Sequence, residues 1–131
     1  SVRGNRVVLV DDSIVRGTTS ARIVKLLREA GATEVHMRSS APPFLNPCYY
    51  GTDIDSKENL IACKHTIEEI GKIIGADSLG YLDINHLNML IGNPPGEGYC
   101  HACFSGEYPT DVPNTAAKNR FEKKISEKEE K

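Results

Sequence analysis

Apolar and polar residues fall into alternating blocks that predict strands and helices in turn. The first block is Val7-Val8-Leu9-Val10, in which three of the four residues are β-branched. Such a run predicts a parallel strand that is central in its sheet and buried on both faces. Gly31 is placed to end the following helix in a left-handed cap. The apolar stripe of that helix consists of Ile23, Val24, Leu27 and Ala30.

A second strand and an irregular segment come next. Residues 34–39 predict a short strand with Val35 and Met37 on one side, and the prolines at positions 42 and 43 break it. We expect irregular chain through residue 55, followed by a brief helix over residues 57–62 that Ser56 caps.

A third strand is expected between two further helices. Thr66 and Glu69 have the spacing of a capping box at the start of the first helix, and Gly75 ends it. Residues 78–82 predict the strand, and Asp83 is placed to cap the last helix. The apolar residues that we expect these helices to bury are Ile67, Ile70, Ile73 and Ile74 in the first and Leu87, Leu90 and Ile91 in the second.

The order strand–helix–strand–helix–strand–helix is typical of an α/β protein with a doubly wound parallel sheet. We assign residues 1–91 to this unit. Residues 92–113 open on Gly-Asn-Pro-Pro-Gly-Glu-Gly and predict a linker and a segment with a Cys-x-x-Cys pair. Residues 114–131 are rich in charge, so we expect a flexible tail with too few apolar residues to order it.

Composition narrows the class of protein without identifying it. The chain has 131 residues, 39% of them apolar, and 16 basic against 18 acidic residues give a formal charge of −2. This balance provides no basic surface for nucleic acid, and no apolar run approaches the ~20 residues that span a bilayer. Because the chain starts on Ser1, without a Met and close to the first strand, we expect it to be a piece of something longer.

Candidate ligand chemistry follows the first strand directly. Asp11 and Asp12 stand at its carboxyl end, where open α/β sheets bind ligands, and residues 13–19 form a polar turn into the helix. The unpaired amides of this turn suit a phosphate dianion, and Gly17 allows several of them to converge on it. The two carboxylates suit vicinal ribose hydroxyls or a divalent cation shared with the ligand. One hydroxyl of residues 18–20 is expected to cap the helix.

Four cysteines carry a second candidate chemistry. Nothing in the chain suggests export, so Cys48, Cys63, Cys100 and Cys103 are not expected to form disulfides. The Cys100/Cys103 pair alone indicates a redox pair, a zinc clip or iron–sulfur ligands, and plain reduced thiols are an alternative. Cys48 lies in the irregular segment, where it can meet a returning tail, whereas Cys63 is expected to be a small packing residue of a helix.

The full string around the two acids has a family resemblance. VVLVDDSIVRGTT, at residues 7–19, closely resembles the phosphoribosylpyrophosphate (PRPP) binding motif of type I phosphoribosyltransferases. The resemblance implies part of the type I phosphoribosyltransferase fold, a parallel sheet with flanking helices, here followed by an irregular tail with cysteines. It also implies that Asp11 and Asp12 lie beside Mg²⁺. The residues that would hold the ribose-5-phosphate half of PRPP are Asp11, Asp12, Ser13, Ile14, Val15, Arg16, Gly17, Thr18 and Thr19.

Further segments resemble the C-terminal part of the glutamine PRPP amidotransferase family. They are SAPP (40–43), PCYYG (47–51), ENLIA (58–62), IGADSL (74–79) and CHACFSGEYP (100–109). The match extends over most of residues 1–112.

These segments are similar to the subclass that carries a [4Fe–4S] cluster, whose ligands match Cys48, Cys100 and Cys103. The fourth family ligand lies upstream of this chain, and Cys63 stands where the family has no ligand. If the three cysteines are ligands, the chain after Gly98 must fold back onto residues 47–50. We expect cluster ligation to provide the binding energy for this, because the tail has few apolar residues.

The resemblance implies an enzyme that this chain cannot complete alone. In the family, an N-terminal glutaminase domain with a terminal Cys nucleophile releases ammonia, which replaces pyrophosphate at C1 of PRPP. The product is 5-phosphoribosylamine, the first intermediate of de novo purine synthesis. No catalytic nucleophile is expected in this chain, which should be inactive by itself. The implied cofactors are Mg²⁺ and the cluster, and the implied setting is a cytoplasmic homo-oligomer that binds purine nucleotides, without nucleic acid or membrane partners.

Two other classes are open alternatives. A non-catalytic PRPP-sensing regulator would keep the fold without the reaction, but it has no need of the three matching cysteines. A receiver-like Mg²⁺ phosphotransfer domain also has paired acids at a strand end. That class requires a phosphoacceptor Asp at another strand end, for which Asp83 is a weak candidate.

Overall fold

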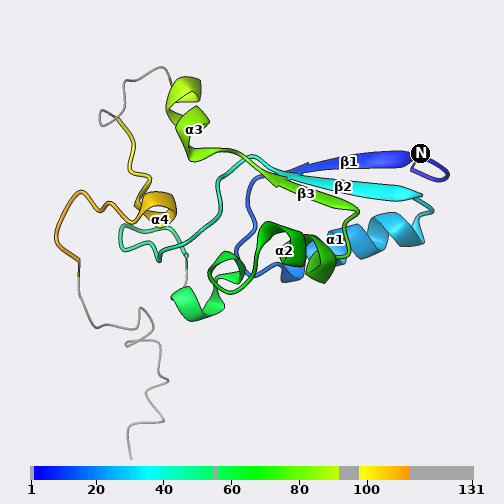
Figure 1. Cartoon of the computed structure of the whole chain (residues 1–131), viewed down its shortest axis with the longest axis horizontal. Helices are drawn as coiled ribbons and strands as arrows, with labels where there is room; N and C mark the ends of the chain where they lie inside the picture. The colour runs from blue at the N-terminus through cyan, green and yellow to red at the C-terminus, as the bar shows by residue number, and fades with distance from the viewer. Residues whose placement is uncertain (1, 55, 92–97, 113–131) are drawn as a thin grey trace, which may run out of the picture.

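The computed structural model describes residues 2–54, 56–91 and 98–112. Its centre is a three-stranded parallel sheet in the order β1-β2-β3 (Figure 1). The strands are β1 (Arg6–Asp11), β2 (Glu34–Ser39) and β3 (Ser78–Tyr81). Met37 is paired with Leu9 on one side and with Leu79 on the other. The predicted α/β class and the parallel strand pairing are confirmed.

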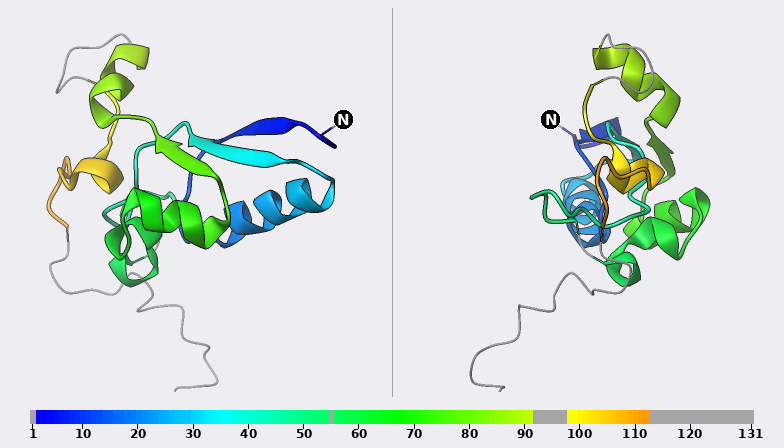
Figure 2. Two further views of the ribbon diagram at one scale, coloured as in Figure 1. Left: turned by 45° about the vertical axis from the view of Figure 1, so that its right-hand side comes forward. Right: turned by 90° about the vertical axis from the view of Figure 1, so that its left-hand side faces the viewer.

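Two helices cover one face of this sheet. α1 (Thr18–Glu29) and α2 (Ile67–Ile74) lie next to each other on that face (Figure 2). The strand order runs in one direction, and right-handed crossovers then place both helices on the same side. The predicted doubly wound arrangement is therefore wrong for the described part of the chain.

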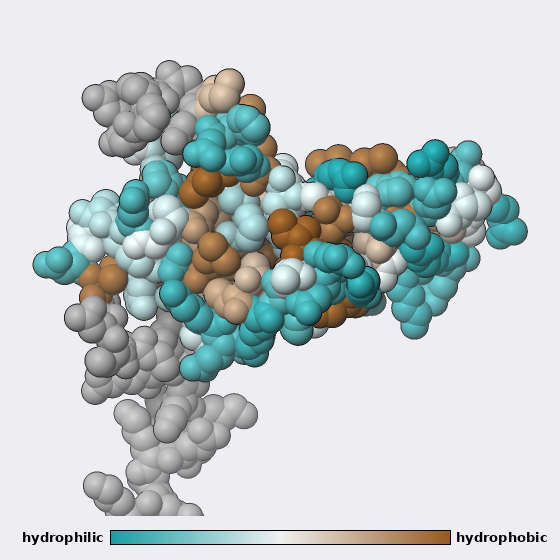
Figure 3. Space-filling model, in the orientation of Figure 1, coloured by the Kyte–Doolittle hydropathy of each residue, from teal (hydrophilic) through white to brown (hydrophobic). Residues whose placement is uncertain are grey.

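Among the described residues β1 is an edge strand, which corrects the prediction that it is central and buried on both faces. Val8 and Val10 are 64% and 67% exposed, while Val7 and Leu9 are half-buried. Apolar side chains are visible along this edge of the sheet in Figure 3. The apolar run is typical of a strand with two covered faces, but the described residues cover only one.

The main core lies between the sheet and the two helices. Val35 and Met37 of β2 are fully buried, as their shared side predicts. In α2 only half of the expected stripe is buried, because Ile67 and Ile73 are 47% and 51% exposed. The buried residues of this main core are Ile14, Met37, Ile61, Ile70 and Ile74.

The predicted helix ends are mostly confirmed. The capping box forms, with Thr66 N donating to Glu69 Oε2 at 2.8 Å and Glu69 N donating to Thr66 Oγ1 at 3.3 Å. Gly31 and Gly75 have φ of 96° and 77°, the left-handed conformation expected after α1 and α2. Asp83 Oδ1 accepts from Asn85 N at 2.8 Å at the start of α3 (Ile84–Ile91).

The region between β2 and α2 departs from prediction. Two 3₁₀ turns, Lys57–Asn59 and Ile61–Cys63, replace the single helix expected there, and the Ser56 side chain caps neither. A short helix, α4 (Ala102–Ser105), lies in the Cys-x-x-Cys segment. Leu90 of α3 is 72% exposed, so its predicted burial is wrong here. Most of the predicted linker (residues 92–97) and the whole charged tail (114–131) lie outside the described residues.

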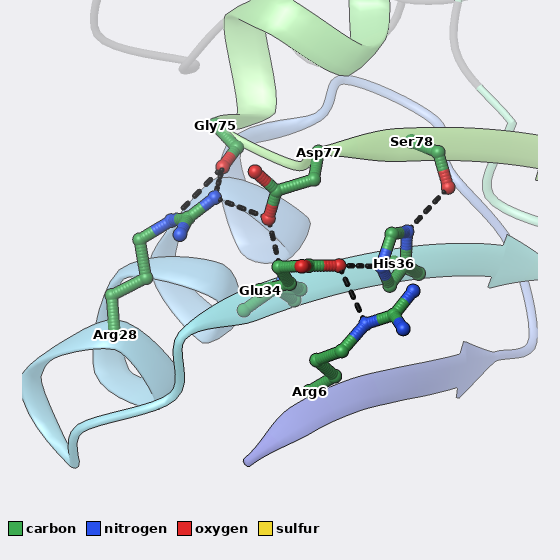
Figure 4. A network of polar contacts seen from close by, with 8 residues as sticks. Arg6, Arg28, Glu34, His36, Gly75, Asp77 and Ser78 are labelled. Atoms are coloured by element: carbon green, nitrogen blue, oxygen red, sulfur yellow. Dashed lines mark hydrogen bonds and ion pairs between the residues drawn. The ribbon is translucent and has the colours of Figure 1, made fainter. Parts of the chain in front are cut away.

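A polar clamp fixes the amino end of the strands, opposite the end where ligands would bind (Figure 4). Asp77 Oδ2 accepts from Val35 N at 2.6 Å, and Asp77 N donates to Val35 O at 2.8 Å. Arg28 of α1 pairs with Asp77 at 2.8 Å and donates to Gly75 O. The hydrogen bond from the Val35 N–H lowers the pKa of Asp77. Burial opposes this effect and the Arg28 guanidinium adds to it, so the net pKa is below the usual value.

A second set of polar contacts lies on the sheet face that the helices leave uncovered. Glu34 Oε2 accepts from Arg6 Nε at 2.8 Å and lies 2.8 Å from His36 Nε2, and His36 Nδ1 lies 2.8 Å from Ser78 Oγ. These contacts join all three strands across their outer face (Figure 4). Within the described residues, no helix is long and apolar enough to cross a membrane.

Candidate functional site

A pocket of about 510 Å³ opens at the carboxyl end of β1, where the chain turns into α1. Eight of the nine residues predicted to bind ribose 5-phosphate line it, and Ile14 is the exception. Ile14 is 2% exposed and belongs to the main core, so it anchors the turn from below. The lining residues are Asp11, Asp12, Ser13, Val15, Arg16, Gly17, Thr18, Thr19, Ser20, Ile23 and Asp53.

Gly17 determines how this turn is built. Its φ of 81° is left-handed, and a Cβ at this position would lie 2.8 Å from Ile61 Cδ1. The left-handed backbone favours glycine, and a Cβ at this position would also force the end of the Ile61 side chain to move. The turn is also tied down by Ile61 N, which donates to Val15 O at 3.0 Å.

The N-terminus of α1 is open toward the pocket. Gly17 occupies the N-cap position and no side chain caps the helix, so the expectation that a hydroxyl of residues 18–20 caps it is wrong. Thr18 and Thr19 are instead the first helical residues and line the pocket. Uncapped amides carry the positive end of the helix dipole, which suits a bound anion.

The two acids after β1 are available to a ligand. Asp12 is exposed and Asp11 half-buried, and within the described residues neither carboxylate forms an ion pair. Asp11 Oδ1 accepts from Asp12 N at 3.0 Å, and Asp12 Oδ1 accepts from Ser13 Oγ at 3.3 Å. Ser40 N donates to Asp11 O at 2.9 Å and thereby fixes the end of β1 against β2.

Asp53 lines the same pocket and was not predicted from the sequence. It comes from the irregular segment after β2, more than thirty residues after the helix start in the chain. An isolated Asp in an irregular segment gives no local signal of its position, because only tertiary packing brings it to the pocket.

The Cys-x-x-Cys segment, residues 98–112, folds back onto the loop that carries Cys48. Leu45 N and Asn46 N both donate to Cys103 O at 3.0 Å, and Tyr108 OH donates to Pro47 O at 2.7 Å. The two segments therefore meet, an arrangement expected from the sequence if the three cysteines are cluster ligands. Aromatic rings and hydrogen bonds join the two segments, and these contacts were not predicted from the sequence.

Three of the four cysteines lie in one region. Cys48 and Cys103 are half-buried against a small core of Phe44, Ile54 and Leu60, which we call the satellite cluster. Burial, then the nearby Cys48 and Cys100 thiols, raise the pKa of Cys103. None of the four cysteines forms a disulfide in the described ranges, and no three His, Cys, Asp or Glu side chains there are placed to hold one metal ion.

Cys63 does not belong to this group. It is exposed at the end of a 3₁₀ turn, and its Sγ donates to Leu45 O at 3.4 Å. The prediction that Cys63 packs in a core is wrong, because the chain there forms a 3₁₀ turn that leaves the side chain at the surface.

Comparisons with known proteins agree with this geometry. No protein-family model matches the chain. The chain is 57% identical over 114 residues to the amidophosphoribosyltransferase of Archaeoglobus fulgidus, covering 86% of this chain and 25% of that protein. It is 55% identical over 114 residues to the Bacillus subtilis amidophosphoribosyltransferase, covering 85% of this chain and 24% of that protein.

A solved structure has the same fold over most of the chain. It is glutamine PRPP amidotransferase from B. subtilis complexed with ADP and GMP, with a TM-score of 0.78 and 52% identity over 88% of this chain and 26% of that one. The chain thus spans about a quarter of the length of the proteins that it matches. By sequence and by its partial type I phosphoribosyltransferase fold, this chain belongs to the amidophosphoribosyltransferase family.

Proposed function

We propose that this chain is the PRPP-binding part of an enzyme that makes 5-phosphoribosylamine from PRPP and glutamine-derived ammonia. One observation carries the proposal: two carboxylates without an ion pair among the described residues and a helix N-terminus without a side-chain cap face the same pocket. The two carboxylates suit sugar hydroxyls, and the amides of the helix N-terminus suit a phosphate.

The turn at residues 13–19 is proposed to hold the 5-phosphate. Its amides and the hydroxyls of Thr18 and Thr19 provide donors at the positive end of α1. Gly17 allows the left-handed conformation of the turn, and Ile14 fixes the turn through the core. A rigid turn would hold the ribose still while its C1 reacts, which lowers the entropic part of the barrier.

Asp11 and Asp12 are proposed to accept hydrogen bonds from the ribose hydroxyls and to hold Mg²⁺ together with the substrate. The described residues offer no set of three donors for one ion, so oxygen atoms of the ligand would complete its coordination. Mg²⁺, when bound, neutralises charge on the departing pyrophosphate. The carboxylates themselves would stabilise the positive charge that develops on the ribose ring.

Cys48, Cys100 and Cys103 are proposed to hold a [4Fe–4S] cluster. Each cysteine of such a cluster binds a different iron, so three neighbouring thiols fit it without converging on one point. The half-buried position of Cys48 and Cys103 against the satellite cluster suits this role. When bound, the cluster would add covalent ties between residues 98–112 and the Cys48 loop.

The remaining parts of the proposal concern the whole protein. The glutaminase domain and the rest of the transferase domain would come from further chain, so this chain alone would make no product. Binding of purine nucleotides belongs to the same proposal, because the solved B. subtilis structure is complexed with ADP and GMP. A cytoplasmic setting, in which cysteines are kept reduced, is part of the same proposal. A homo-oligomeric full-length enzyme is part of the same proposal.

The double substitution Asp11→Asn with Asp12→Asn tests this function in the full-length protein. Both changes preserve side-chain shape and remove charge, and neither acid is in an ion pair within the described chain. We expect kcat/KM for PRPP to fall by at least a hundredfold, ~3 kcal/mol of transition-state stabilisation. Glutamine hydrolysis measured without PRPP should be unchanged. Wild-type turnover of PRPP in the double variant would contradict the assignment.

A further inference from the structure

One residue of the pocket reaches it from outside the binding motif. Ten of the eleven lining residues lie between positions 11 and 23, and Asp53 is the eleventh. The chain bends at Gly51, whose φ is 113°, and then brings the exposed Asp53 to the pocket rim.

The position of Asp53 is set by its buried neighbour Ile54. Its neighbour Ile54 is 4% exposed in the satellite cluster, and Cys48 N donates to Ile54 O at 3.2 Å. Val15, in the turn at residues 13–19, packs against the same cluster. The loop that presents Asp53 and the turn that would receive the phosphate are therefore held by one set of apolar contacts.

Asp53 changes the charge of the pocket. The three carboxylates of Asp11, Asp12 and Asp53 against the guanidinium of Arg16 give the lining a net charge of −2. The side chains that line this cavity thus include more acidic than basic groups. Sugar hydroxyls can use the two acids of the motif, whereas the third carboxylate repels any anion that enters without a cation.

We propose that Asp53 is a specificity-determining residue that makes the pocket select phosphate esters carried as divalent-cation complexes over the metal-free anions. This inference rests on the proposed function, since it assumes that the pocket receives a sugar phosphate. A bound divalent cation offsets the carboxylate charge, so the repulsion acts mainly on metal-free ligand. The effect depends on the charge of Asp53 rather than on its shape.

Titration with ribose 5-phosphate, followed through the amide shifts of residues 13–19, tests the proposal. It would be carried out with EDTA and with excess Mg²⁺, on the wild-type chain, Asp53→Asn and Asp53→Glu. Asp111→Asn is the matched control, because Asp111 is exposed and lies outside the pocket lining. We expect Asp53→Asn to tighten metal-free binding about three- to tenfold, with less effect at high salt or with Mg²⁺. Asp53→Glu and Asp111→Asn should bind as the wild type does.

The outcomes separate this inference from the proposed function. If the wild type binds ribose 5-phosphate but Asp53→Asn binds the metal-free ligand no more tightly than Asp111→Asn, the role of Asp53 is wrong and the proposed function stands. Weaker metal-free binding by Asp53→Asn would also overturn it. If the wild type fails to bind with and without Mg²⁺, the proposed function fails and this inference falls with it.

Discussion

The ring of Phe104 lies against the ring of Phe44, with 4.9 Å between the centroids and an interplanar angle of 34°. Phe44 belongs to the satellite cluster, and Val15 of the turn at residues 13–19 packs against the same cluster. Residues 98–112 and the turn at residues 13–19 therefore share one small core, although they are far apart in the sequence.

Phe104→Ala should destabilise the chain by about 2 kcal/mol, because it removes a half-buried ring from an aromatic pair. Urea unfolding followed by circular dichroism measures this. Tyr99→Ala is the control, since Tyr99 is 74% exposed and should change the free energy of unfolding little. Equal effects of the two substitutions would show that Phe104 does not hold the segment.

Gly17→Ala should cost about 1–3 kcal/mol and weaken ligand binding as well. The substitution meets both the left-handed φ of 81° and a contact of 2.8 Å between the new Cβ and Ile61. Gly4→Ala isolates the first effect, because Gly4 has φ of 76° but open space around it. A Gly17 variant no less stable than the Gly4 variant would mean that the approach to Ile61 is not close.

Asp77→Asn should reduce the sensitivity of the chain to acid. The pKa of Asp77 is lowered from 3.8, so its contribution to stability is present above that pH and is lost as pH falls through the lower pKa of the folded state. The free energy of unfolding of the wild type should thus fall more steeply than that of Asp77→Asn below about pH 4. Parallel curves for the two proteins between pH 2 and pH 6 would rule out this linkage.

Tyr81→Phe should leave the chain as stable as before or stabilise it by up to about 1 kcal/mol. The Tyr81 hydroxyl is buried without a hydrogen-bond partner among the described residues, and burial raises the pKa of Tyr81 to about 12. Removing an unsatisfied hydroxyl removes its desolvation cost. A loss of more than 1 kcal/mol on thermal or urea unfolding would indicate a partner for this hydroxyl.

Residue patterns within short stretches of the sequence predicted the structural features that depend on neighbouring residues. The bounds of β2, the Thr66/Glu69 capping box and the left-handed Gly75 follow from residue spacing and backbone preference. The string at residues 7–19 predicted most of the pocket lining, because a strand, a turn and a helix start that adjoin in sequence also adjoin in space.

The features that were missed depend on tertiary contacts. Whether Val8 and Val10 of β1 are covered depends on which other elements pack beside this strand. The apolar run of β1 does not say which elements these are. Asp53 reaches the pocket only through the packing of Ile54, and Cys63 is exposed because a 3₁₀ turn replaces a helix. The fold-back of residues 98–112 was expected only if the cysteines are cluster ligands, and the aromatic contacts that accompany it were not predicted.

The most direct test of the central claim maps where ribose 5-phosphate binds. In an ¹⁵N-labelled chain with Mg²⁺, we expect weak, saturable amide shifts concentrated at residues 11–20, and we expect them to be lost in Gly17→Ala and in the double Asp11→Asn, Asp12→Asn variant. Ribose without phosphate should produce much smaller shifts at the same ligand concentration. Shifts spread over the surface, shifts centred on another pocket, or an undiminished response in both variants would contradict the claim that this pocket binds a sugar phosphate.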